Sequence, residues 1–265
     1  MRSKYALRFL ALGYLALLLG IPVALVFINA FQDGIGAAWD AVTTPEAQHA
    51  FWLTFIMVIV AVPLNTIFGV LCALAIVRQR FRGRALLNAM VDLPFAVSPV
   101  VVGLALLLVY GRRDGWIGPW LSDHGVQIIF STPGMILATM FVSLPFVVRE
   151  VIPVLREIGT EQEQAAATLG ASKLQTFLRV TLPAIRWGVA YGVVLTTARA
   201  LGEFGAVSVV SGKLSGQTET ATLYVENRFQ RFDETGAYAA SVVLALLAFA
   251  TLLAMNLIKP KEASR

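Results

Sequence analysis

Long apolar runs restrict the fold of this chain more than any other feature of its sequence. A helix that crosses a bilayer needs roughly 20 mostly apolar residues, because every backbone polar group in hydrocarbon must be hydrogen-bonded within the segment. About six runs are that long, at residues 9–29, 51–77, 86–110, 128–148, 187–211 and 238–258. The sequence therefore predicts an all-α integral membrane protein with about six transmembrane helices, built as a single domain over residues 1–265.

Basic residues in the loops predict which ends face the cytoplasm, where loops carry an excess of Lys and Arg. When alternate loops are assigned to opposite sides, one side holds only a minority of the 21 basic residues. This minority comprises Arg112, Arg113, Arg199, Lys213, Arg228 and Arg231. The other side holds both termini and the loops at 78–84 and 149–186. We therefore expect both termini in the cytoplasm and the lipid bilayer as the surrounding medium.

Several other functions find no support in the residues. The net charge of +5 does not indicate nucleic-acid binding, because the basic residues lie beside apolar runs. Cys72 is the one cysteine, and the two histidines, His49 and His124, lie far apart, so we predict no disulfide and no metal site. The stretch 209–213 lacks two positions of a phosphate-binding loop, so nucleotide binding is not expected here.

A polar segment interrupts this apolar chain between the fourth and fifth runs. It reads EQEQAAATLGASKLQTFLRVTLP from Glu161 to Pro183. Thr160 with Glu163, and Ser172 with Gln175, have the spacing of two helix capping boxes. Gly170 lies between them, where a left-handed residue can end a helix. The pattern predicts two short cytoplasmic helices joined by a tight turn.

Two interpretations of the alanines in this segment remain open on helix signals alone. Ala165, Ala166 and Ala167 present almost no side chain. Small residues let a backbone approach another surface closely, so they either pack beneath the transmembrane helices or form a docking element for a cytoplasmic partner.

The segment resembles the cytoplasmic EAA loop of the ABC-importer permeases. That loop runs Glu-Ala-Ala, three residues, Gly, nine residues, then Ile-x-Leu-Pro. Here it reads Gln164-Ala165-Ala166, then Gly170, then Val180-Thr-Leu-Pro183. Gln164 replaces the glutamate of the family, and Glu163 stands one residue early. The resemblance implies a type I ABC-importer permease-like fold with a cytoplasmic coupling helix in a loop at about 156–186.

Three further stretches resemble the sulfate/thiosulfate permeases, in particular their W-type subunit. They are VDLPFAVSPVVVGL at 91–104, LPFVVREVIPVL at 144–155 and ARALGEFGAVSVVSG at 198–212. The resemblance implies import of sulfate or thiosulfate across a bacterial inner membrane. It also implies a T-type permease subunit as sister, two copies of an ATP-binding subunit that carry ATP and Mg, and a periplasmic sulfate/thiosulfate-binding protein. The chain itself would be non-catalytic and bind no cofactor or metal.

The residues that would couple the permease to the ATPase follow from the match to the EAA loop. They are Glu163, Gln164, Ala165, Ala166, Gly170, Ala171, Ser172, Leu182 and Pro183.

A path for a doubly charged anion needs hydrogen-bond donors in place of water, and broken helices supply them. Pro94, Ser98 and Pro99 interrupt the third run. Arg199 and Glu203 lie four residues apart near the end of the fifth run, where they can form an ion pair. Ser208 and Ser211 follow them. We predict these side chains as pathway residues, although a proline kink that only shapes packing and a structural ion pair at a subunit interface are alternatives.

Other functions fit less well. A self-sufficient secondary transporter is compatible with six helices, but the helices hold no deep chain of acids for proton coupling. A membrane enzyme would need a paired-acid, nucleophile or metal constellation, and none appears in the runs. Molybdate, tungstate or another tetrahedral oxyanion remains the competing substrate.

Overall fold

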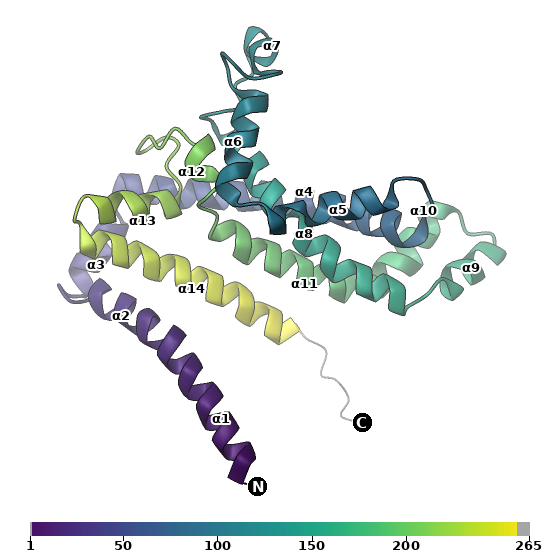
Figure 1. Ribbon diagram of the computed structural model, residues 1–265, viewed down its shortest axis with the longest axis horizontal. Coiled ribbons are helices and arrows are strands. Elements are labelled where there is room, and N and C mark those ends of the chain that lie inside the picture. The colour runs from purple at the N-terminus through teal and green to yellow at the C-terminus, as the bar shows by residue number, and fades with distance from the viewer. Residues whose placement is uncertain (1, 259–265) are drawn as a thin grey trace.

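The computed structural model describes residues 2–258, with side chains described for residues 7–254, and all the regular secondary structure in this part of the chain is helical (Figure 1). The longer helices are α1 (Arg2–Leu15), α2 (Ile21–Ala30), α4 (Pro45–Arg78), α5 (Arg84–Ala96), α6 (Pro99–Tyr110), α8 (Thr132–Glu157), α11 (Leu182–Leu201), α13 (Ala221–Gln230) and α14 (Glu234–Ile258). The shorter ones are α3 (Ile35–Val42), α7 (Gly118–Asp123), α9 (Glu161–Thr168), α10 (Lys173–Thr176) and α12 (Val207–Val210), with π-helical turns η1 (Ala16–Gly20) and η2 (Phe177–Thr181).

Five of these helical stretches are long and apolar enough to cross a membrane, and α5 with α6 brings the number to six if the bent pair is one span. The prediction of about six transmembrane helices is therefore confirmed. In Figure 1 the helices α4, α8, α11 and α14 lie along the long axis, with α9 and α10 at one end and α3 and α13 at the other.

The centre of the bundle is the contact of α8 with α4 and α11. Val147, Val148 and Val151 of α8 are fully buried there. Glycines on both neighbours make the contact close, because a Cβ on Gly69 would meet Val147 at 2.7 Å and a Cβ on Gly192 would meet the Val147 Cα at 2.8 Å. Small residues at such a crossing let helix backbones approach, which maximises van der Waals contact in a membrane.

The third predicted helix is broken in the structure. α5 and α6 meet at Val97 and Ser98 with a bend of 115°. Pro99 has no N–H to continue the helix, and Ser98 directly before it has φ −58°, ψ 137°, outside the helical region. As a result α6 leaves the bundle and carries α7 at its tip, as Figure 1 shows.

The fifth predicted helix is shorter than expected, since α11 ends at Leu201 and residues 207–210 form the separate helix α12. The carboxylate of Glu203 accepts the backbone N–H of Ala206 at 2.9 Å, which satisfies a donor of the new turn. Two glycines, Gly202 and Gly205, flank this acid and have low helix propensity. The expectation that one helix extends to Ser211 is therefore wrong.

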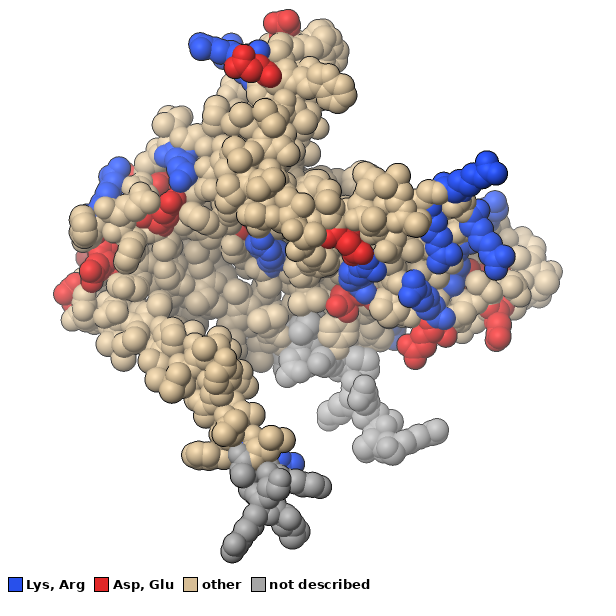
Figure 2. All heavy atoms as spheres, viewed as in Figure 1, with Lys and Arg blue, Asp and Glu red and all other residues tan. Residues whose placement is uncertain are grey.

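Basic side chains gather at the end of the bundle that carries α9 and α10, as Figure 2 shows. Arg80 and Arg82 are exposed in the turn between α4 and α5 at that end. The basic residues Lys259, Lys261 and Arg265, used above to orient the C-terminus, lie outside the described residues, and so do the side chains of Arg2 and Lys4.

Candidate functional site

The turn at Gly170 forms as the sequence predicts. Gly170 has φ +83°, a left-handed conformation that costs glycine little. Its N–H donates to the carbonyl of Ala167 at 3.0 Å, and the N–H of Ala171 donates to the carbonyl of Ala166 at 3.0 Å. These two bonds satisfy carbonyls at the end of α9. The turn therefore fixes the direction in which the chain leaves the short helix.

One of the two predicted capping boxes forms and the other does not. The Ser172 hydroxyl accepts the N–H of Gln175 at 3.3 Å, and the Gln175 side chain accepts the N–H of Ser172 at 2.9 Å. Thr160 makes no such bond, because its backbone is already near the helical region at φ −117°, ψ 0°. Its hydroxyl instead accepts the side-chain amide of Gln164 at 3.1 Å.

The second predicted short helix is the start of a long one. α10 passes through the π-helical turn η2 into α11, so Lys173–Leu201 forms a candidate span of 29 residues. Pro183 has no N–H to offer to the preceding turn, and the wide turn directly before it accommodates that loss. The second half of the predicted coupling segment is thus continuous with a helix of the bundle core.

Glu163, the residue directly before Gln164, forms an ion pair with Arg78. Its carboxylate lies 3.1 Å from the Arg78 Nε, and it accepts the Thr181 hydroxyl at 3.0 Å. The two charged side chains are only 23% and 15% exposed. Gln164, by contrast, is exposed on the surface of α9. Glu163, the acid one position before Gln164, therefore holds α9 to the bundle.

Arg78 joins three helices at this point. It is the last residue of α4, and its Nη1 and Nη2 donate to the carbonyls of Leu155 at 2.9 Å and Gly159 at 2.6 Å. With the Glu163 pair, it connects the end of α4 to the end of α8 and to α9. Arg78 was not identified as a site residue from the sequence. The available signal was its position as the basic residue at the end of a long apolar run.

One face of the α9–α10 hairpin is open and partly apolar. Leu169 is 88% exposed and Leu174 is 67% exposed, while Ala165 is also exposed. Large apolar side chains on a polar hairpin are unfavourable in water unless another surface covers them. This face is therefore available to a partner, whereas Leu182 is half-buried and belongs to α11.

Replacing Gly170 with valine should impair coupling without disturbing the bundle. No heavy atom lies within 4 Å of a Cβ at this position, so only the φ of +83° is strained. A β-branched residue pays at least about 1–2 kcal/mol there, whereas asparagine tolerates the conformation. We expect Gly170→Val to lower the ATP-driven transport rate several-fold and Gly170→Asn to retain it. Equal rates for the two variants would show that the turn does not matter.

Gln164→Glu should be tolerated. The side chain is exposed and its one described hydrogen bond is to the Thr160 hydroxyl, which a carboxylate can accept in turn. We expect unchanged assembly with the ATPase on co-purification. Loss of assembly would contradict the placement of Gln164 outside the ion pair.

The two helix breaks meet in the middle of the bundle. A Cβ on Gly205 would lie 2.9 Å from the Pro99 Cβ, so the segment after α11 touches the first turn of α6. A Cβ on Gly103 would meet the carbonyl of Ala206 at 2.8 Å, so α6 and α12 are also in close contact. The structure thus brings Pro99, Glu203 and Ser208 into one neighbourhood, which also contains Ser98 at the N-terminus of α6.

The predicted pathway side chains differ in what their polar atoms do. The Arg199 Nη1 lies 2.7 Å from the Glu203 Oε2, so the predicted ion pair forms. The Ser98 side chain is exposed and makes no capping bond. Ser208 donates to the carbonyl of Gly205 at 2.8 Å. Ser211 is buried and donates to the carbonyl of Thr218 at 2.6 Å, so its hydroxyl supports the loop before α13.

A partly exposed ion pair differs from what proximity along the chain predicts. Asp92 of α5 lies close in sequence to the arginines at 78–84, which predicts a pair with one of them, but its carboxylate accepts the Nε of Arg149 at 2.7 Å. The reason is that α5 packs along α8, which brings residue 92 beside residue 149 and away from the end of α4.

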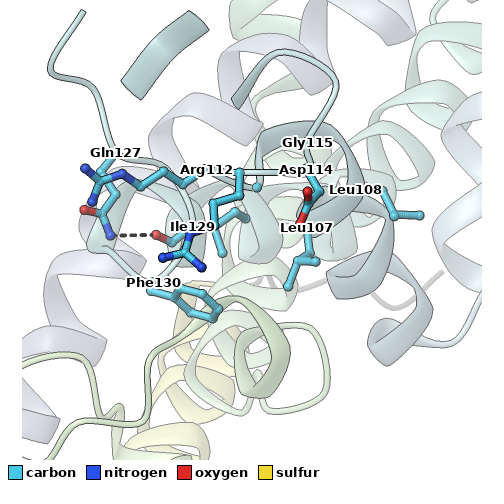
Figure 3. A pocket seen from close by; sticks show the side chains of 10 residues that line it. Leu107, Leu108, Arg112, Asp114, Gly115, Gln127, Ile129 and Phe130 are labelled. Atoms are coloured by element: carbon cyan, nitrogen blue, oxygen red, sulfur yellow. Dashed lines mark hydrogen bonds between the residues drawn. The ribbon is translucent and has the colours of Figure 1, made fainter. Parts of the chain in front are cut away.

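A cavity of about 710 Å³ lies at the end of α6, between that helix and the loops on either side of α7. Figure 3 shows Gln127, Ile129 and Phe130 on one side of it and Leu107, Leu108 and Asp114 on the other. Arg112 and Arg113 complete its polar lining. The cavity contains none of the predicted pathway or coupling residues.

Comparison with known proteins matches residues 65–263 to the family described as binding-protein-dependent transport system inner membrane component. The chain is 52% identical, over 98% of its length and 94% of the relative, to the sulfate transport system permease protein CysW of Synechocystis. The Escherichia coli protein of that name is 47% identical over 92% of this chain and 84% of the relative. CysT of Synechococcus elongatus is 41% identical over 92% and 87%.

A solved structure shares the fold. It is a bacterial ABC transporter involved in the import of the acidic polysaccharide alginate, matched with a TM-score of 0.82 at 19% identity over 99% of this chain and 96% of that chain. At that identity the match concerns the fold alone. The family match and the extensive identity to the permease proteins above establish that this chain belongs to the binding-protein-dependent transport system inner membrane components and is a non-catalytic permease subunit of an ABC transporter, in which ATP is bound by a partner ATPase.

Proposed function

We propose that the chain is one of two permease subunits of an ATP-driven importer for sulfate and thiosulfate. The observation that carries this proposal is the 52% identity to a sulfate permease over 98% of this chain and 94% of the relative. An alignment of that extent spans the broken segments in the middle of the bundle, where an anion would pass. Molybdate or tungstate is the alternative substrate, since these oxyanions share the tetrahedral shape and the charge.

The partners follow from the same relatives. A T-type permease, represented by the CysT relative, would be the sister subunit. Two ATP-binding subunits would dock on the exposed face of the α9–α10 hairpin through the coupling residues, and a periplasmic sulfate/thiosulfate-binding protein would deliver the anion on the opposite side. Closure of the ATPases would move α9, and the Glu163–Arg78 pair would pass that movement to α4 and α8.

This arrangement implies which end of the molecule would face each side of the membrane. The hairpin and the arginines of the α4–α5 turn would face the cytoplasm, and α3 and α13 would face the periplasm. Both termini would then be cytoplasmic, in the inner membrane of a bacterium. The excess of basic residues at the hairpin end supports this orientation.

The test is uptake of labelled sulfate into proteoliposomes that contain this chain, a T-type sister subunit, the ATPase and the binding protein. We expect uptake to require both ATP and the ATPase, and to persist in excess molybdate. Sulfate uptake without the ATPase would mean that the chain is a self-sufficient carrier. Uptake of molybdate in preference to sulfate would assign the alternative substrate.

A further inference from the structure

Among ionisable side chains near the middle of the bundle, Glu203 is the most deeply buried. Its side chain is 1% exposed, whereas the side chain of its partner Arg199 is 29% exposed. One carboxylate oxygen accepts the N–H of Ala206, and the other faces Arg199 at 2.7 Å without hydrogen-bond geometry. The pair is therefore asymmetric, with the anion enclosed by protein and the cation facing outward.

The pair lies well inside the membrane-spanning part of the chain. Ala200 and Leu201, which follow Arg199 in the last turn of α11, pack against Val58 and Val62 of α4. α4 extends from Pro45 to Arg78, so these contacts fall near its middle. A guanidinium at this depth is too costly to face hydrocarbon, so its exposed side must meet water or another protein surface.

The surroundings of the pair favour a water-filled path. The backbone after Glu203 is irregular and touches the break between α5 and α6 through Gly205 and Pro99. Irregular backbone at membrane depth persists where it lines a cavity or is covered by protein. Ser98, exposed at that break, adds a hydroxyl, and the first turn of α6 adds free N–H groups beside it.

We propose that Arg199, held in place by the buried carboxylate of Glu203, contacts the translocated oxyanion in the middle of the bundle. This inference rests on the proposed function and names the residue that recognises the substrate. Arg199 has five N–H donors, and the ion pair with Glu203 leaves donors for a tetrahedral dianion. Glu203 is a positioning residue that also offsets the positive charge, so that the anion can leave again.

The experiment measures uptake of sulfate and molybdate by the reconstituted complex with Arg199→Gln, Arg199→Lys and Glu203→Gln. Loss of charge-assisted hydrogen bonds should lower uptake by Arg199→Gln about tenfold or more. The lysine variant keeps the cation but loses the planar set of donors, so its uptake should lie between that of Arg199→Gln and that of wild type. Assembly of the complex and its ATPase activity should stay near wild type, which separates a pathway role from a folding role.

Glu203→Gln tests the positioning role, because its amide oxygen can still accept the N–H of Ala206 while the anion that holds Arg199 is lost. We expect it to assemble and to lower uptake several-fold. Wild-type uptake by Arg199→Gln or by Glu203→Gln would overturn the inference and leave the pair as a structural contact. A wild-type complex that imports molybdate instead of sulfate would overturn only the proposed substrate, and the variants would then be judged with molybdate. Import of neither oxyanion would overturn both.

Discussion

Replacing Arg78 with methionine should abolish most ATP-driven uptake. Methionine fills much of the same volume but leaves Glu163 without its cation and the carbonyls of Leu155 and Gly159 without their donors. Because the pair is partly exposed, we expect the lost contacts to cost about 1–3 kcal/mol of stabilisation, the range for an unsatisfied polar group. That is enough to detach α9 from α4, and we expect uptake to fall about tenfold or more.

The matched control for this prediction is Arg80→Met. Arg80 is two residues away in the same turn and is exposed, so the identical substitution should leave uptake near wild type. ATP hydrolysis in the assembled complex should continue in Arg78→Met while transport fails, since the residue links the hairpin to the bundle and does not touch nucleotide. Equal uptake by the two variants would show that the Arg78 contacts do not transmit movement from the hairpin to the bundle.

Local signals in the sequence predict the coupling loop well where a single residue decides the conformation. Gly170 in a left-handed turn and the Ser172 capping box depend on neighbours within five residues, and both form. Thr160 fails because its backbone follows the end of α8, which the local pattern does not contain. Arg78 was missed for the same reason, since 85 residues separate it from Glu163 along the chain.

The residues that interrupt helices in the middle of the bundle could be recognised from the sequence, but the geometry of the breaks could not. Prolines at 94 and 99 signal an interruption, but a bend of 115° depends on where α6 finds its contacts. The apolar composition of the fifth run predicts one helix to Ser211. The helix ends earlier, where the carboxylate of Glu203 accepts the N–H of Ala206. The partner of Asp92 likewise depends on how α5 packs on α8. In each case a tertiary contact overrides a local preference.

Replacing Gly192 with leucine should strongly destabilise the fold. A side chain at this position would begin 2.8 Å from the Cα of Val147, which is backbone and cannot rotate away. The α8–α11 contact must then separate, at a cost of about 3 kcal/mol or more for such overpacking. Gly20→Leu is the matched control, since no heavy atom lies within 4 Å of a Cβ there. In detergent we expect the Gly192 variant to unfold at a clearly lower temperature and the Gly20 variant to resemble wild type. Equal unfolding temperatures would mean that α8 and α11 do not pack as closely as the glycine contact requires.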